Sequence, residues 1–224
     1  RGFGIACSQY VVPGSMCDMM IIFETENGFL DSVFFSLQVL EEHANAPQGP
    51  DTYGYICLDN TDREWEKAPV YNWEEISLQD DDRDSDGVRL EFEGRSPYNI
   101  GETIVISLPF ETQFYGQLYD SISVSTNGFI SMGNQELITN FQNWPLDRAL
   151  GGGVGMIAPL WDDLTLTGNG NVYTFYDDEN NRFIVEWYRL RHRFGGTRDL
   201  SFQVVLYDNN FWITQTGDQD ILFQ

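Results

Sequence analysis

Positive charge is scarce in this chain. Its 224 residues include 12 Lys and Arg against 35 Asp and Glu, which gives a formal net charge of −23 at pH 7, and Lys67 is the only lysine. Such a surface repels phosphate backbones, so we expect no nucleic-acid partner. The arginines gather between Arg189 and Arg198, where we expect them to balance nearby acids on a solvated strand and turn.

Long apolar runs and paired cysteines are also missing. No stretch of 18 apolar residues occurs, so we expect no membrane insertion. The cysteines Cys7, Cys17 and Cys57 lack C-x-x-C spacing, which argues against a zinc site. A disulfide between Cys7 and Cys17 would leave Cys57 unpaired and buried. Three buried thiols are the alternative, and the sequence does not decide between the two.

Catalytic combinations are sparse. His43 and His192 are the only histidines, and no G-x-S-x-G, H-E-x-x-H or phosphate-binding glycine motif occurs. Asp162 and Asp163 are adjacent, so in a strand they would point to opposite faces and not share one substrate. We therefore predict no catalytic residues and no enzymatic activity.

The residues that are abundant indicate β structure. Apolar residues make up 42% of the chain and aromatic residues 15%, which is ample for a core. Residues 16–40 predict two strands around the TENG turn at 25–28. Residues 171–190 and 200–215 alternate apolar and polar side chains, as sequential antiparallel hairpins do. YNWEEISL and VRLEFE also resemble strands. We predict an all-β fold, an antiparallel, jelly-roll-like β-sandwich of about ten strands.

A linker rich in Pro, Gly and small polar residues follows the first hairpin, and we place a domain boundary near Ala46. Residues 1–45 are then a partial immunoglobulin-like β region, and residues 46–224 the β-sandwich domain. An isolated hairpin is marginal in water. We therefore expect one of three arrangements for its strands. They pack on the main domain, they continue a sandwich whose earlier strands precede Arg1, or they accept a strand from another molecule.

The most specific motif is an acidic loop. Asp82, Asp84, Asp86, Gly87 and Glu93 satisfy D-x-D-x-D-G-x5-E, the ligand spacing of a calcium loop. Helical flanks are missing, so we predict a structural calcium ion inside a β protein. Asp82, Asp84 and Asp86 are the main ligands, with Glu93 and the Val88 carbonyl completing the shell. The alternative is a solvated acidic turn.

Other polar and aromatic groups have simpler explanations. We expect Asp59, Asn60 and Asp62 to cap a turn, with ligation of a second ion as the alternative, and Asp177, Asp178 and Glu179 to be solvated in a hairpin turn. A structural role near Trp161 is expected for Asp162 or Asp163. Aromatic residues such as Trp144, Trp161, Trp187 and Trp212 would form a sugar-stacking platform if exposed, but alternation favours core packing.

Several ordered motifs carry a family resemblance: GYICLDNTD, YNWEEI, LPFETQFYGQLYDSISVSTNGFISMG, NWPL, MIAPLWDDL, NRFIVEWYRL and FQVVLYD. Over residues 53–224 the chain resembles a β-sandwich accessory module of large secreted bacterial surface proteins, found beside gingipain-like and subtilisin-like peptidases. STNGFISMG followed by APLWDDL is similar to nidogen-type extracellular domains. Residues 14–40 are similar to the last strands of the immunoglobulin-like domains that precede such modules.

The resemblance implies export to the extracellular space or cell surface, with any peptidase chemistry in a separate domain. We expect a noncatalytic module that acts in adhesion or assembly. The alternatives are a subunit of a self-assembling filament that uses strand complementation, and a carbohydrate-binding accessory domain of a secreted peptidase. Expected partners are other domains of the same secreted protein, copies of the chain itself, or glycans.

Overall fold

The computed structural model describes residues 14–39, 46–77, 87–93, 101–135, 141–142, 155–194 and 198–224. These residues form twelve strands in antiparallel pairing and contain no helix, so none that could cross a membrane. The predicted all-β antiparallel sandwich is confirmed. The chain divides into two compact units, residues 1–71 and 72–224. The domain boundary predicted near Ala46 stays a prediction.

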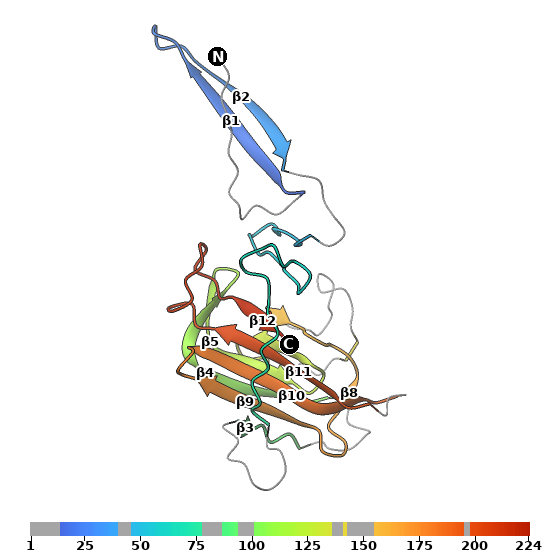
Figure 1. Ribbon diagram of the computed structural model, residues 1–224. Helices are drawn as coiled ribbons and strands as arrows, with labels where there is room; N and C mark the ends of the chain where they lie inside the picture. Colours follow the sequence, from blue (N-terminus) through green and yellow to red (C-terminus); the bar gives the residue numbers. More distant parts are fainter. Residues whose placement is uncertain are drawn as a thin grey trace. The chain divides into compact units, whose positions relative to one another are not determined.

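The first unit contains the predicted hairpin, drawn in blue in Figure 1. Strand β1 (Met16–Glu24) pairs with β2 (Leu30–Gln38) from Met16 opposite Gln38 to Glu24 opposite Leu30. Gly28 takes a φ of 77° in the connecting turn, a conformation that glycine adopts without strain. Within the described residues, β1 and β2 pair only with each other.

The second unit is built from two sheets. The four-stranded sheet has the order β4-β5-β6-β7, and the six-stranded sheet has the order β12-β11-β10-β9-β3, with β8 paired to β10. Their bounds are β3 Val88–Arg89, β4 Thr103–Phe114, β5 Gln117–Ser125, β6 Phe129–Met132, β7 Met156–Ile157, β8 Leu164–Thr165, β9 Asn171–Asp177, β10 Arg182–His192, β11 Leu200–Tyr207 and β12 Ile221–Phe223.

Alternation along β10 separates the two faces of the six-stranded sheet. Phe183, Val185 and Trp187 alternate with Ile184 and Glu186, and all five are buried. The indole nitrogen of Trp187 donates a hydrogen bond to the carbonyl oxygen of Ser125 in β5, at 2.7 Å. Trp187 therefore faces the other sheet, and the core of the sandwich lies between the two sheets (Figure 1).

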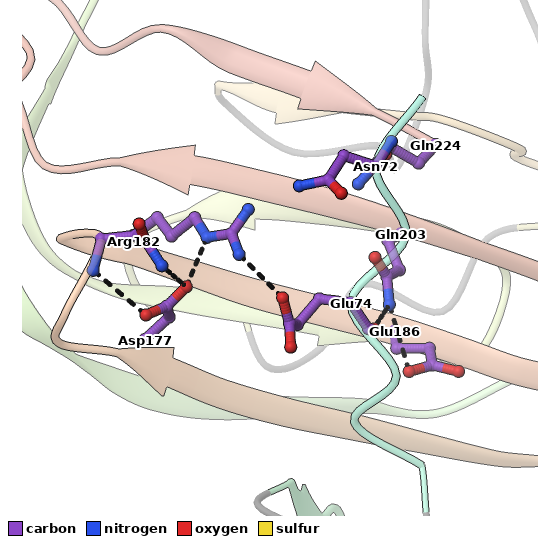
Figure 2. A network of polar contacts seen from close by, with 8 residues as sticks. Asn72, Glu74, Asp177, Arg182, Glu186, Gln203 and Gln224 are labelled. Carbon is purple, nitrogen blue, oxygen red and sulfur yellow. Dashed lines mark hydrogen bonds and ion pairs between the residues drawn. The ribbon is translucent and has the colours of Figure 1, made fainter. Parts of the chain in front are cut away.

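The opposite face of the six-stranded sheet is covered by residues Asn72–Ser77, which we call the strap. The strap runs across the strands as an extended segment without a ladder of its own, as Figure 2 shows. The prediction of a strand at YNWEEISL is therefore wrong for its described part, because the backbone of these residues hydrogen-bonds to side chains of the sheet and not to a neighbouring strand. VRLEFE forms only the short strand β3.

Candidate functional site

The most elaborate polar cluster lies beneath the strap, on the outer face of the six-stranded sheet (Figure 2). Glu186 of β10 stands opposite Gln203 of β11 in the register of the sheet, and both side chains are completely buried. Buried carboxyl and amide groups carry a large desolvation cost unless they are hydrogen-bonded. The strap supplies partners for both groups.

Three backbone groups of the strap hydrogen-bond to side chains of the sheet, and one of these side chains, Gln203, also binds Glu186. The side-chain amide of Gln203 donates to the carbonyl oxygen of Glu74 at 2.5 Å and to a carboxyl oxygen of Glu186 at 3.3 Å. The backbone amide of Ile76 hydrogen-bonds to Glu186. At the start of the strap, the amide of Asn72 donates to the side-chain oxygen of Gln224 at 2.7 Å. The bonds to the strap therefore involve the backbone of every second residue, at Asn72, Glu74 and Ile76.

An apolar socket receives the side chain of Ile76, which is only 1% exposed. Its buried neighbours Tyr173, Ile184 and Val205 come from β9, β10 and β11. Partly buried side chains complete the rim of the socket: Phe175, Tyr188, Tyr207 and Leu222. Full burial of an isoleucine contributes about 2 to 3 kcal/mol, so this one residue is a main apolar anchor of the strap.

Gly87 fits closely behind the strap. A Cβ atom added at Gly87 would lie 2.1 Å from the carbonyl oxygen of Ile76, a distance that requires a backbone shift. The sixth position of the acidic motif therefore has a packing reason to be glycine, in addition to the sharp turn that a calcium loop would need.

Arg182 joins the strap to the β9–β10 turn. Its guanidinium contacts Asp177 at 2.6 Å and Glu74 of the strap at 3.0 Å, while the side chains of Arg182 and Asp177 are 8% and 9% exposed. Burial acts to raise the pKa of Asp177, but hydrogen bonds from Arg182 and Asn180 outweigh it and leave that pKa lowered. The prediction that Asp177 is solvated is wrong; Asp178 and Glu179 are exposed as expected.

Glu186 is the most perturbed carboxyl of this cluster. Burial raises its pKa to about 7, and the nearby charge of Glu75 acts in the same direction. Hydrogen bonds from Gln203 and Ile76 oppose the shift. One carboxyl oxygen of Glu186 is buried with no hydrogen-bond partner. The strap therefore closes over a group that takes up or releases a proton near neutral pH.

The predicted calcium ligands are only partly visible. Asp82, Asp84 and Asp86 lie outside the described residues. Val88 lies in β3 opposite Thr174, and the backbone amide of exposed Glu93 donates to the carboxylate of Glu102 at 2.8 Å. Among the residues that the structure describes, no group of three or more His, Cys, Asp or Glu side chains is placed to hold a metal. The calcium loop stays a prediction.

Asp162 and Asp163 turn to different partners. Asp162 lies 3.3 Å from Nδ1 of His192, and Asp163 lies 2.9 Å from the guanidinium of Arg193. Burial raises the pKa of Asp163, with Arg193 opposing the shift and Asp162 adding to it. The expectation that the two aspartates do not form a carboxylate pair agrees with this geometry. His43 lies outside the described residues.

The arginine cluster balances acids as predicted, although one member is buried. Arg191 contacts Asp199 at 2.6 Å, and both side chains are about two-fifths exposed. Arg193, by contrast, is 9% exposed where it meets Asp163. Arg189 lies over the ring of Tyr188, 5.0 Å from its centroid. One member of the cluster, Arg193, therefore has a structural role, because its contact with Asp163 joins the end of β10 to the segment before β8.

The turn-capping role predicted for the LDNTD segment is confirmed for Asp59 and Asp62. The carboxylate of Asp59 accepts hydrogen bonds from the amide and hydroxyl of Thr61, at 2.7 and 2.6 Å, and these bonds lower the pKa of Asp59. The carboxylate of Asp62 accepts from the amide of Asp59 at 2.7 Å. Both aspartates thus serve the turn itself.

Core packing accounts for two of the four tryptophans named above. Trp161 and Trp187 are 6% and 0% exposed, so neither belongs to a surface platform for sugar stacking. Trp212 is 47% exposed, and its indole nitrogen donates to the carbonyl oxygen of Asn180 at 3.0 Å. Trp144 lies outside the described residues.

The cysteines differ from both expectations. Cys17 and Cys57 are both free and exposed, so the predicted disulfide at Cys17, the buried Cys57 and the alternative of three buried thiols are wrong. Cys57 forms an isolated bridge with Gln48, which places it in an exposed loop region and not in a core. Cys7 lies outside the described residues.

Little in the sequence indicates the cluster beneath the strap. Glu186 and Gln203 interrupt apolar strands on the face that alternation alone would leave in water. Their burial follows from the strap, which is remote in sequence. The only available signal was the placement of two polar residues in the middle of otherwise apolar strands.

The fold and its two packed sheets define an antiparallel β-sandwich domain. Residues 98–216 match the model of the family described as NIDO related. This match spans more than half of the sequence, and the chain belongs to the NIDO-related family. Searches of curated proteins and of solved structures gave no match. The resemblance to nidogen-type domains is thereby confirmed, and the family indicates a module of the extracellular type.

Proposed function

We propose that this chain is a noncatalytic module of a secreted or cell-surface protein, and that it acts in adhesion or assembly by binding copies of itself or other domains of the same protein. Membership of the NIDO-related family supports an extracellular setting. The secreted bacterial surface protein suggested by the sequence motifs is one such setting.

The observation that carries the proposal is the apolar character of the β1–β2 hairpin. Cross-strand partners lie on the same face of a sheet. One face of this hairpin is apolar at all but one position and holds Cys17, Met19, Ile21, Phe23, Val33, Phe35 and Leu37 together with Asp31. Phe23 and Val33 are 49% and 50% exposed. Met19, Ile21 and Phe35 on the same face are partly buried. Contiguous apolar surface of this kind marks contact sites for other proteins.

Strand complementation is the second candidate, and the edges of the hairpin favour it. Each strand has nine residues, and within residues 14–39 and the other described segments neither outer edge pairs with a third strand. Unpaired edges accept strands from other chains. A filament would arise if each copy completed the hairpin of the next. Carbohydrate binding has less support, because Trp161 and Trp187 are buried.

The native cysteines test the proposed assembly. Cys17 lies on the apolar face of the hairpin, whereas Cys57 is exposed in the loop region of residues 46–77. As the protein concentration rises from micromolar to millimolar, alkylation of Cys17 by iodoacetamide should slow several-fold, with the rate at Cys57 unchanged. Peptide mass spectrometry separates the sites. Constant rates at Cys17, or an equal decrease at both cysteines, would contradict assembly through this face.

We also propose that calcium stabilises the module through Asp82, Asp84, Asp86, Val88 and Glu93. A ligand that binds only the folded state raises stability by mass action. EDTA should therefore lower the melting temperature of the chain, and Asp84→Asn should reduce the effect of EDTA. The matched control is Asp178→Asn in the exposed β9–β10 turn, which should leave the effect intact. An unchanged melting curve in EDTA removes calcium from the proposal.

A further inference from the structure

We propose that the outer face of the six-stranded sheet is a seat for an extended peptide, and that in the assembled state the strap of a second copy occupies it in place of the chain's own strap. This inference rests on the proposed function in assembly and names the segment that would be exchanged. The seat comprises the Ile76 socket and the polar side chains of Arg182, Glu186 and Gln203.

The seat recognises both the sequence and the direction of its occupant. The socket takes one branched apolar side chain, and Arg182 takes a carboxylate two residues earlier, at Glu74. Gln203 binds the carbonyl oxygen of Glu74, and Glu186 binds the amide of Ile76. A peptide of the type acidic-x-apolar satisfies all these groups in one orientation, and the strap is such a segment.

The strap can leave its seat without disrupting either sheet. It belongs to no strand ladder, and its contacts with the sheet are those of a few side chains and backbone groups. It also begins directly after the first compact unit ends at Tyr71. The strap is therefore the first segment of the second compact unit, and an element at the end of a unit can be exchanged between copies because the same contacts re-form.

The charges around Glu186 weaken the seat as the pH rises. The charge of Glu75 in the strap acts on Glu186, and Gln203 of β11 and the backbone amide of Ile76 hydrogen-bond to its carboxyl group. Arg182 is already shared by Asp177 and Glu74. Ionised Glu186 therefore adds a buried negative charge beside Glu75, and the strap binds more tightly when Glu186 is neutral.

A synthetic peptide tests the seat directly. The probe is fluorescein-labelled Asn72–Ser77, NWEEIS, titrated into the full-length chain carrying Ile76→Ser, whose own strap is weakened. We expect saturable binding of this peptide. The same peptide with serine in place of isoleucine should bind with an affinity at least about tenfold lower. The affinity should be higher at about pH 5.5 than at about pH 8, and Glu186→Gln in the same background should remove that difference.

Absence of binding to an Ile76→Ser chain that keeps its near-ultraviolet circular dichroism would overturn the proposal. If that variant does not fold, the wild-type chain serves: excess NWEEIS should raise hydrogen exchange of the chain's own residues 72–77 while β10 and β11 stay protected. Unchanged exchange of residues 72–77 also overturns it. Concentration-dependent protection of Cys17 without peptide binding would leave the proposed assembly standing and remove only the exchanged strap.

Discussion

Replacing Glu186 by Gln should raise the free energy of unfolding at about pH 8 by about 3 kcal/mol. The folded pKa of this carboxyl is raised from 4.5 to about 7. Between those values the folded state holds a proton that the unfolded state has lost, so wild-type stability falls as the pH rises and levels off above about 7. Glutamine keeps the shape and hydrogen-bonding capacity of the side chain without the buried charge.

Urea unfolding across this pH range measures the effect. The two proteins should converge below the unfolded pKa of 4.5, where Glu186 is neutral in both states, and should diverge progressively toward pH 7. The matched control is Glu111→Gln, a substitution of an exposed residue of β4, which should follow the wild-type curve. Parallel curves for Glu186→Gln and wild type at every pH would show that Glu186 is not buried beneath the strap.

Replacing Arg182 by Met should cost about 3 to 5 kcal/mol of stability, the usual effect of removing one partner of a buried ion pair. The side chains of Arg182 and Asp177 are both less than a tenth exposed. Methionine fills much of the volume but leaves the Asp177 carboxylate without its cation. The strap also loses the contact between Arg182 and Glu74.

Arg191→Met is the matched control for this substitution. Arg191 contacts Asp199 at the same distance of 2.6 Å, but both side chains are about two-fifths exposed. Exposed pairs contribute at most about 1 kcal/mol. Chemical denaturation of Arg182→Met and Arg191→Met therefore shows whether the loss of stability depends on the burial of the ion pair or on its contact distance. Equal and small losses would contradict a buried ion pair at Arg182.

Alternation predicted the strands of the second unit because most of them bury one face in the sandwich core. Phe183, Val185 and Trp187 repeat at every second position, and the turn at Asn181 follows from a polar, acidic sequence. The β1–β2 hairpin was predicted from its TENG turn. In these segments, local preference and tertiary packing agree.

The strap was not predictable in the same way. Its sequence is compatible with a strand, and its actual position depends on a socket built from three strands distant in sequence. The burial of Glu186, Gln203 and Asp177 follows from that position and from the partner Arg182. The alternation of apolar and polar residues along one segment does not show which residues from distant segments come into contact. The calcium motif, in contrast, rests on spacing alone.

Sedimentation velocity of two variants tests the central claim, that the module assembles through the apolar face of its hairpin. Phe35 lies on that face opposite Met19, and its neighbour Phe34 lies on the other face and is 74% exposed. The account predicts reversible, concentration-dependent association of the wild-type chain, loss of association in Phe35→Ser, and little change in Phe34→Ser. A wild-type chain that stays monomeric at every concentration, or equal losses in both variants, would contradict it.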